Sequence, residues 1–193
     1  MFRHVLLFLF LATAPALAVA GPYEDGLAAY EKGEYQKALE LYTSAAEQGV
    51  VDAQLLLGFL YFNGEAVAKN YPTAYKWFKK AADQGDARSQ SQLGMMYDTG
   101  EGVPQDFKTA AFWYDKAARQ NFGQAQDALG LMYALGQGVP KNLVLAHVWL
   151  NLAAAQGVEN AVENREEVEK LMSEEEIDQA QKRAREMLEQ MAN

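Results

Sequence analysis

Apolar side chains return along this chain at the spacing of amphipathic helices. Between residues 107 and 121 they fall at i, i+3, i+4, i+7 and i+8, which places them on one face of a helix. Residues 87–98 contain no proline and few β-branched residues, so a second helix is expected there. Gly100, Gly102 and Pro104 separate the two segments and supply positive-φ freedom and a helix stop. The pattern predicts two helices joined by a glycine-rich loop.

The same pattern recurs at an interval of 36 residues. Tryptophan returns at Trp77, Trp113 and Trp149, and a period in this range is the sequence signature of a helical repeat array. Glycine, tyrosine and alanine keep the register at Gly58, Gly94 and Gly130, at Tyr61, Tyr97 and Tyr133, and at Ala74, Ala110 and Ala146. We expect the three tryptophans to be interior and equivalent. We expect the glycines inside helices to let a neighbouring helix come close.

The three copies share the pattern LGxxYxxGxGV-P-(D/N)-xxxA-xW(Y/F/L)xxAAxxG, which resembles the Sel1-like repeat, a relative of the tetratricopeptide repeat. The resemblance implies an all-α, right-handed α-solenoid built from helix pairs. We expect repeats over residues 52–86, 87–122 and 123–160, and a shorter tetratricopeptide-like unit over residues 21–51. Residues 65–68 depart from the pattern, so we expect the loop of the first copy to run differently.

The two ends of the chain differ from the repeats. Residues 1–20 combine a short basic start, an apolar run and small-residue cleavage sites, which is the layout of a secretory signal peptide. The apolar run is too short to span a bilayer, so we expect a cleaved signal, no membrane insertion afterwards and a periplasmic or secreted protein. A single domain would then span residues 21–193. Its last part, residues 161–193, loses the period, and a capping box at residues 173–176 predicts the charged C-terminal cap of a solenoid.

The composition excludes several kinds of chemistry. The chain has no cysteine and a net charge of −9, so it offers no disulfide or thiol nucleophile and repels nucleic acid. His147 is the one histidine after residue 20, and we expect it to be a partly buried packing residue without nearby partners. We therefore expect no catalytic residue, no metal and no cofactor. Cysteine-rich Sel1-like proteins have been described as binding or cleaving β-lactams, and that activity does not carry over to a chain without cysteine.

In stacked helical hairpins the first helix of each pair lines the concave face, and its positions outside the repeat pattern are free to vary. We expect these positions to form a groove for a protein or peptide, apolar at its N-terminal end and more polar toward the middle. The candidate contact residues are Tyr23, Leu27, Tyr30, Leu55, Phe59, Phe62, Arg88, Ser91, Met95, Asp98, Asp127, Leu131 and Ala134. Phe59 and Phe62 have an alternative interpretation as core residues.

Two classes of function remain open. The first is a periplasmic or secreted protein–protein interaction module that scaffolds or regulates an envelope partner through the concave face. The alternative is an accessory protein, or a weak hydrolase, of cell-wall or exopolysaccharide machinery, with a glycan as its partner. A glycosidase needs two carboxylates about 5–10 Å apart. Asp98 and Asp127 form the candidate pair on neighbouring helices, and no further residue supports the glycan interpretation.

Overall fold

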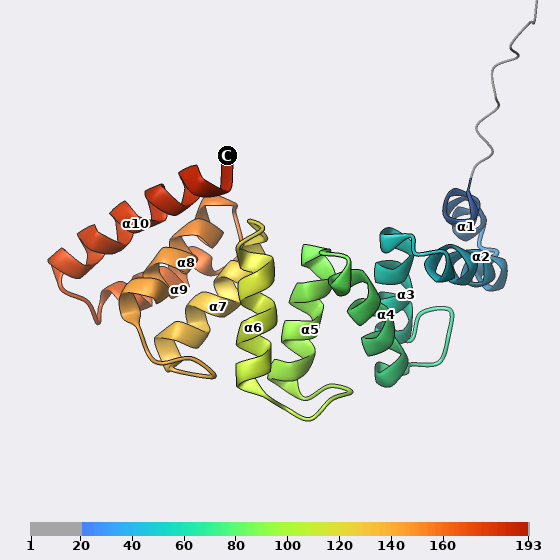
Figure 1. The fold of residues 1–193 in the computed structure, drawn as a ribbon, viewed down its shortest axis with the longest axis horizontal. Coiled ribbons are helices and arrows are strands. Elements are labelled where there is room, and N and C mark those ends of the chain that lie inside the picture. Colours follow the sequence, from blue (N-terminus) through green and yellow to red (C-terminus); the bar gives the residue numbers. More distant parts are fainter. Residues whose placement is uncertain (1–20, 193) are drawn as a thin grey trace, which may run out of the picture.

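The computed structural model describes residues 21–192 as ten α-helices, with no strand among them (Figure 1). They are α1 (Pro22–Glu31), α2 (Tyr35–Glu47), α3 (Val51–Asn63), α4 (Tyr71–Asp83), α5 (Ala87–Thr99), α6 (Phe107–Ala118), α7 (Gly123–Leu135), α8 (Leu143–Ala155), α9 (Ala161–Glu169) and α10 (Glu174–Ala192). None of these ten is both long and apolar enough to cross a membrane. The signal peptide expected over residues 1–20 lies outside the described residues.

Successive helices pack on one another in chain order. Helices α1–α2, α3–α4, α5–α6 and α7–α8 form hairpins, and the second helix of each pair packs on the first helix of the next. Figure 1 shows the resulting elongated stack, with α1 and α2 at one end and α9 and α10 at the other. The expected all-α solenoid is confirmed.

The repeated glycines mark the closest approach within each hairpin. A Cβ added to Gly94 in α5 would lie 2.6 Å from Cδ1 of Tyr114 in α6. At Gly58 it would lie 2.3 Å from Cε1 of Phe78, and in the third copy Leu150 faces Gly130 at the equivalent place. Any larger residue at the glycine would push the paired helix away. The close packing predicted from the period is therefore confirmed.

The three tryptophans are not equivalent, contrary to the expectation. Trp113 is 7% exposed and Trp149 is 3% exposed, whereas Trp77 is only half-buried. Trp113 packs with aromatic residues of the preceding repeat, and Trp149 packs in the cluster that α10 covers. Trp77 borders the short N-terminal unit instead, where the Lys80 ammonium group lies 4.3 Å from its ring centre. Burial at this position depends on the neighbouring repeat, which the period does not encode.

The loops inside the repeats share one backbone form. Asn70, Asp106 and Asn142 each accept a hydrogen bond from the backbone amide three residues later, at 3.0, 3.2 and 2.9 Å, as helix N-caps do. The loop of the first copy was expected to run differently, and this expectation is wrong. Ala66 has φ +60°, close to the +70° of Gly138 at the equivalent position of the third copy. The first copy therefore keeps the loop form with an alanine in the left-handed region.

A buried glutamine ties each repeat to the one before it. In α5, Gln90 Nε2 donates to the Ala82 carbonyl at the end of α4 (3.2 Å), and Gln120 Nε2 donates to Gln90 Oε1 (2.7 Å). Two further pairs repeat this arrangement, Gln84 with Gln54 at 2.8 Å and Gln156 with Gln126 at 2.6 Å. The 36-residue spacing of these glutamines was visible in the sequence and was overlooked. The buried amides of Gln54, Gln90 and Gln126 each donate to a carbonyl of the preceding repeat and so fix the register between repeats.

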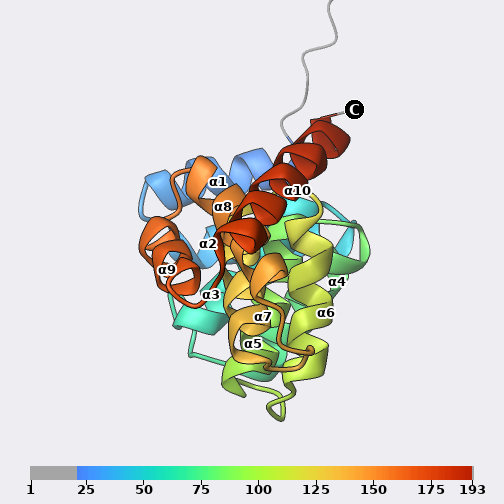
Figure 2. The ribbon, with the colours of Figure 1, turned by 90° about the vertical axis from the view of Figure 1, so that its left-hand side faces the viewer.

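The last two helices close the stack in different ways. Helix α9 packs on α8 as the first helix of a further pair would, whereas α10 crosses onto α8 (Figure 2). Ala180 and Ala184 are fully buried where α10 meets the array, because only small side chains let the helix come this close. The predicted capping box opens α10, with the Ser173 backbone amide donating to Glu176 Oε2 at 2.8 Å.

Candidate functional site

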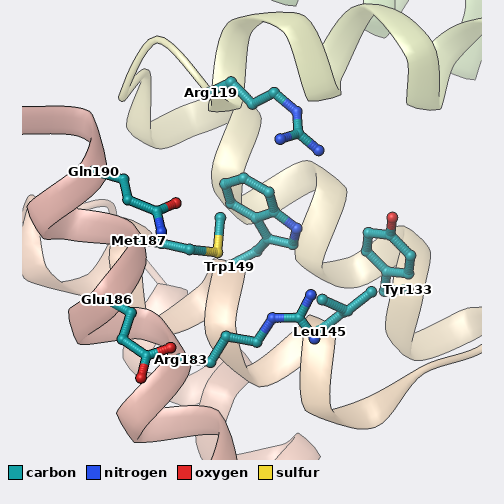
Figure 3. Close-up of a pocket in the computed structure, with 8 residues that line it drawn as sticks. All are labelled: Arg119, Tyr133, Leu145, Trp149, Arg183, Glu186, Met187 and Gln190. Atoms are coloured by element: carbon teal, nitrogen blue, oxygen red, sulfur yellow. The ribbon is translucent and has the colours of Figure 1, made fainter.

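A pocket of about 430 Å³ lies between α10 and the end of the repeat array (Figure 3). Four helical segments contribute its walls: the C-terminal end of α6, then α7, α8 and α10. The lining residues are Arg119, Tyr133, Leu145, Trp149, Arg183, Glu186, Met187 and Gln190. The pocket forms because α10 crosses α8 instead of continuing the stack.

The repeat register explains why space is left at this position. One repeat earlier, the Tyr75 hydroxyl lies 3.0 Å from the Tyr97 hydroxyl and fills the corresponding region. Ala111 takes the place of Tyr75 in the next repeat, beside Tyr133, so the bulk of a phenol ring is missing there. The pocket therefore coincides with a local departure from the repeat.

Arg119 follows the last residue of α6 and is held by a single ion pair. Its Nε donates to Asp115 Oδ2 at 2.7 Å, and this hydrogen bond is the main reason why the pKa of Arg119 is raised. The two terminal nitrogens make no hydrogen bond with any other described residue, and 65% of the side chain is exposed. Asp115 thus orients the guanidinium group of Arg119 and leaves its two terminal nitrogens without a hydrogen-bond partner among the described residues.

Arg183 approaches the same pocket from α10. Figure 3 shows Arg119 and Arg183 directed toward the middle of the pocket from opposite sides, with the Trp149 indole between them in this view. No ion pair joins Arg183 to another residue within 21–192. The nearest lining carboxylate, Glu186, lies 4.0 Å from the Lys182 ammonium group. Two guanidinium groups consequently share one pocket with a single carboxylate on its wall.

This arrangement suits binding rather than covalent chemistry. A guanidinium group offers a planar set of donors that matches a carboxylate or phosphate. Among the described residues no group of three or more His, Asp or Glu side chains is placed to hold a metal ion. The pocket wall carries one carboxylate, Glu186, and no histidine or serine. Its chemistry is that of an anion-binding site with mainly polar walls and a smaller apolar patch.

The candidate contact residues predicted from the sequence lie outside this pocket. At the N-terminal end, Leu27 and Tyr30 are 41% and 40% exposed, and Tyr30 stacks edge-on against Tyr35 with ring centres 5.1 Å apart. Tyr23 is half-buried, with its ring centre 6.2 Å from that of Tyr42. Leu27 and Tyr30 therefore keep surface for a partner, and their role in binding stays a prediction.

The next group packs against the second helix of its own hairpin. Leu55 is 7% exposed, and the rings of Phe59 and Phe78 lie 5.2 Å apart between centres. Phe62 lies 5.0 Å from Tyr71 in the same cluster. Ser91 is buried as well, and Met95 packs on the neighbouring core cluster. Leu55 and Ser91 are buried, whereas Phe59, Phe62 and Met95 are half-buried, so the role of this group in binding stays a prediction.

The remaining polar candidates have partners within the protein. Arg88 pairs with Asp52 at 2.6 Å and with Asp86 at 2.8 Å. Asp127 Oδ1 accepts a hydrogen bond from Asn164 of α9 at 3.0 Å, and burial raises the pKa of Asp127.

Three further candidates from the sequence complete this set. Leu131 and Ala134 pack on the cluster that holds Val168 of α9, so α9 covers part of the predicted groove. Burial raises the pKa of Asp98, which does not line the pocket under α10.

His147 was expected to be partly buried and without partners, and this expectation is wrong. The side chain is fully buried in α8, and its Nε2 lies 2.7 Å from Glu169 Oε1 of α9. Arg165 Nε lies 3.3 Å from the same carboxylate oxygen. The partner comes from the part of the chain where the period stops, so the repeat pattern gave no sign of it. His147 holds α9 on α8.

The comparisons with known proteins agree with the repeat architecture. A family model described as Sel1 repeat matches four consecutive segments, residues 14–50, 51–86, 87–122 and 123–158. These matches cover more than half of the chain. A search of curated proteins finds no match.

Three solved structures are similar to this chain. A Sel1 repeat protein from Oxalobacter formigenes is 34% identical with a TM-score of 0.69, covering 74% of this chain and 59% of its own. A protective antigen of uropathogenic Escherichia coli strains, described as displaying an SLR fold, is 30% identical with a TM-score of 0.62. The match covers 87% of this chain and 45% of the antigen. Helicobacter pylori cysteine rich protein B is 26% identical with a TM-score of 0.53, and the match covers 67% of this chain and 92% of that protein. The chain thus spans less than two thirds of the length of the first two.

Proposed function

Because this chain belongs to the Sel1 repeat family, whose members are generally protein–protein interaction modules, we propose that it binds a protein or peptide partner at the pocket under α10. In this proposal the protein acts in the periplasm or outside the cell and scaffolds or regulates an envelope partner. The observation that carries it is the pair of arginines, Arg119 and Arg183, that line one pocket.

The charge of the whole chain makes this pocket distinctive. The net charge is −9, so an anionic partner is repelled by most of the surface and attracted where two cations converge. Complementary charge of this kind selects a partner and its orientation more than it adds raw affinity. A binding site with two arginines on an acidic protein therefore favours one docking position over the others.

The location outside the cytoplasm rests on two supports. Residues 1–20 have the layout of a secretory signal peptide. One structural relative is described as a protective antigen present in uropathogenic Escherichia coli strains, and an exported protein agrees with that description. Fractionation of cells that carry a C-terminally tagged chain would test this part separately. Recovery of the tagged protein only in the cytoplasm, at full precursor mass, would contradict it.

Site-specific photo-crosslinking in cells tests the binding site. A photoreactive amino acid replaces Gln190, which lines the pocket, or Gln181, which is exposed on α10 outside it. We expect a discrete crosslinked protein from position 190 that is absent or much weaker from position 181. The captured protein is then purified and its affinity measured by calorimetry. Identical crosslink patterns from the two positions, or no affinity of the purified protein, would show that the pocket is not the binding site.

A further inference from the structure

We infer that the pocket under α10 belongs to a groove that binds an extended acidic peptide segment, with a glutamate or aspartate carboxylate held between Arg119 and Arg183. The inference rests on the proposed function and names the chemistry of the ligand at that site. It follows from the length of the groove, its charges and the apolar patch within it.

The pocket continues along α10 in both directions. An adjoining hollow of about 320 Å³ shares Arg183 and Glu186 with it, and another of about 210 Å³ shares Arg119 and Met187. The residues of α10 that line the three run from Gln179 to Met191 at i, i+3, i+4, i+7, i+8, i+11 and i+12, which is one face of the helix. This face is about 18 Å long at 1.5 Å per residue. An extended peptide of about five residues has the same length.

The charges along the groove favour an acidic segment. Arg119, Lys182 and Arg183 line it, with Glu186 as the one carboxylate on its wall. Asp115 already occupies Nε of Arg119, so the terminal nitrogens of that guanidinium group face the groove. A carboxylate that bridges the two arginines completes charge-assisted hydrogen bonds which no described residue supplies.

The walls favour a peptide over a free anion. Leu145, Met187 and the small exposed part of Trp149 form an apolar patch in the otherwise polar pocket, which suits the methylene groups of a glutamate side chain. The Gln190 amide carries both donors and an acceptor, which match a peptide backbone. An isolated phosphate ion would use the arginines and leave this patch and the adjoining hollows unused.

NMR titration with synthetic peptides tests the inference. The probe is Ac-Ala-Glu-Ala-Glu-Ala-NH₂, in which both carboxylates lie on one side of the extended chain and the terminal carboxylate is blocked. Its matched control is Ac-Ala-Gln-Ala-Gln-Ala-NH₂, and sodium phosphate forms a third arm. The ¹⁵N-labelled protein reports binding through the Trp149 indole signal, assigned with Trp149→Phe. Further reporters are the backbone amides of α10.

Charge-neutral variants locate the binding site. We expect Arg119→Gln and Arg183→Gln to weaken binding of the glutamate peptide about tenfold or more, because each removes charge-assisted hydrogen bonds. Arg185→Gln makes the same change on the exposed side of α10 and should leave binding within about twofold of wild type. Ala111→Tyr should abolish binding by restoring the side chain that fills the preceding repeat. Circular dichroism spectra establish that each variant is folded.

Each outcome decides the inference. Preferential binding of the glutamate peptide, lost in the two arginine variants and kept in Arg185→Gln, supports it. Equal binding of the glutamine peptide, or full binding by Arg119→Gln and Arg183→Gln, would overturn it. Phosphate that perturbs the same signals as strongly as the peptide would make the pocket a site for a free anion instead. Crosslinking at position 190 that persists while the peptides fail would reject the acidic ligand and leave the proposed function standing.

Discussion

A single methyl group at Gly138 is predicted to force two repeats apart. The glycine has φ +70°, and a Cβ built on it would lie 2.1 Å from the Phe107 carbonyl oxygen at the start of α6. Gly157 provides a matched control, since it has φ +75° and nothing within 4 Å of the added atom. Both alanine substitutions impose a similar backbone strain, and only Gly138→Ala adds a clash with another repeat.

The two costs can be estimated separately. An alanine in the left-handed region costs about 1–2 kcal/mol, and its smaller freedom in the unfolded chain offsets about 0.4–1 kcal/mol of this. Gly157→Ala should therefore reduce the free energy of unfolding by about 1 kcal/mol. At Gly138 the backbone must also move by roughly 1 Å to restore an ordinary contact, and overpacking of this kind costs about 1–3 kcal/mol. The total for Gly138→Ala is about 2–4 kcal/mol.

Thermal melts followed by circular dichroism measure the difference. In a chain of this size about 1 kcal/mol shifts the midpoint by about 2–4 °C. We expect Gly138→Ala to melt about 5–15 °C below wild type and Gly157→Ala about 2–4 °C below it. Midpoints for the two variants within 2 °C of each other, a window set at about half of the smaller expected shift, would refute the steric argument. The close contact between the third loop and α6 would then carry no energetic weight.

Three further predictions concern the repeats. Gln90→Leu should lower the free energy of unfolding, measured with urea, by about 1–2 kcal/mol, since two hydrogen bonds are lost. A double-mutant cycle with Gln120→Ala should give a coupling energy of about 1 kcal/mol between the two glutamines. A coupling energy of zero would contradict the proposed link. Trp113→Ala should lower the free energy of unfolding by about 3–5 kcal/mol, and Trp77→Ala should lower it clearly less, because Trp77 is half-buried. Equal losses of unfolding free energy in the two variants would contradict this difference in burial. Burial raises the pKa of Asp98, so the folded state binds its proton more tightly and the stability contributed by protonation is lost as pH rises through that pKa. Asp98→Asn should therefore raise the midpoint of urea unfolding at pH 7 and leave it unchanged at pH 4. A lower midpoint for Asp98→Asn than for wild type at pH 7 would contradict this reasoning.

The sequence predicts the repeated parts of the fold because one local rule applies several times. The glycine at positions 58, 94 and 130 predicts a close helix contact in each hairpin, and the structure has it in all three. The same reasoning gives the helix caps, since a cap depends on residues within one turn of it. The buried glutamine pairs follow the same period and were equally accessible to sequence analysis.

The candidate site could not be predicted in this way. Arg119 and Arg183 belong to no repeating position, and they meet only because α10 crosses α8. The angle at which a final helix crosses the array depends on long-range packing at Ala180 and Ala184, which no local pattern specifies. The covering of part of the predicted groove could not be predicted for a related reason. Helix α9 covers Leu131 because the stack continues beyond the last recognisable repeat.

A symmetric array binds a partner specifically only where its repeats differ. If every junction presented the same side chains, a partner would bind equally well in several registers along the array. Here the difference arises from three substitutions in register, Ala111 for Tyr75, Asp115 for Lys79 and Arg119 for Asp83. The first removes bulk beside Tyr133, and the second orients Arg119 toward the space that results. Helix α10 then closes the last repeat and completes the groove, so the element that protects the end of the solenoid also forms the proposed binding site.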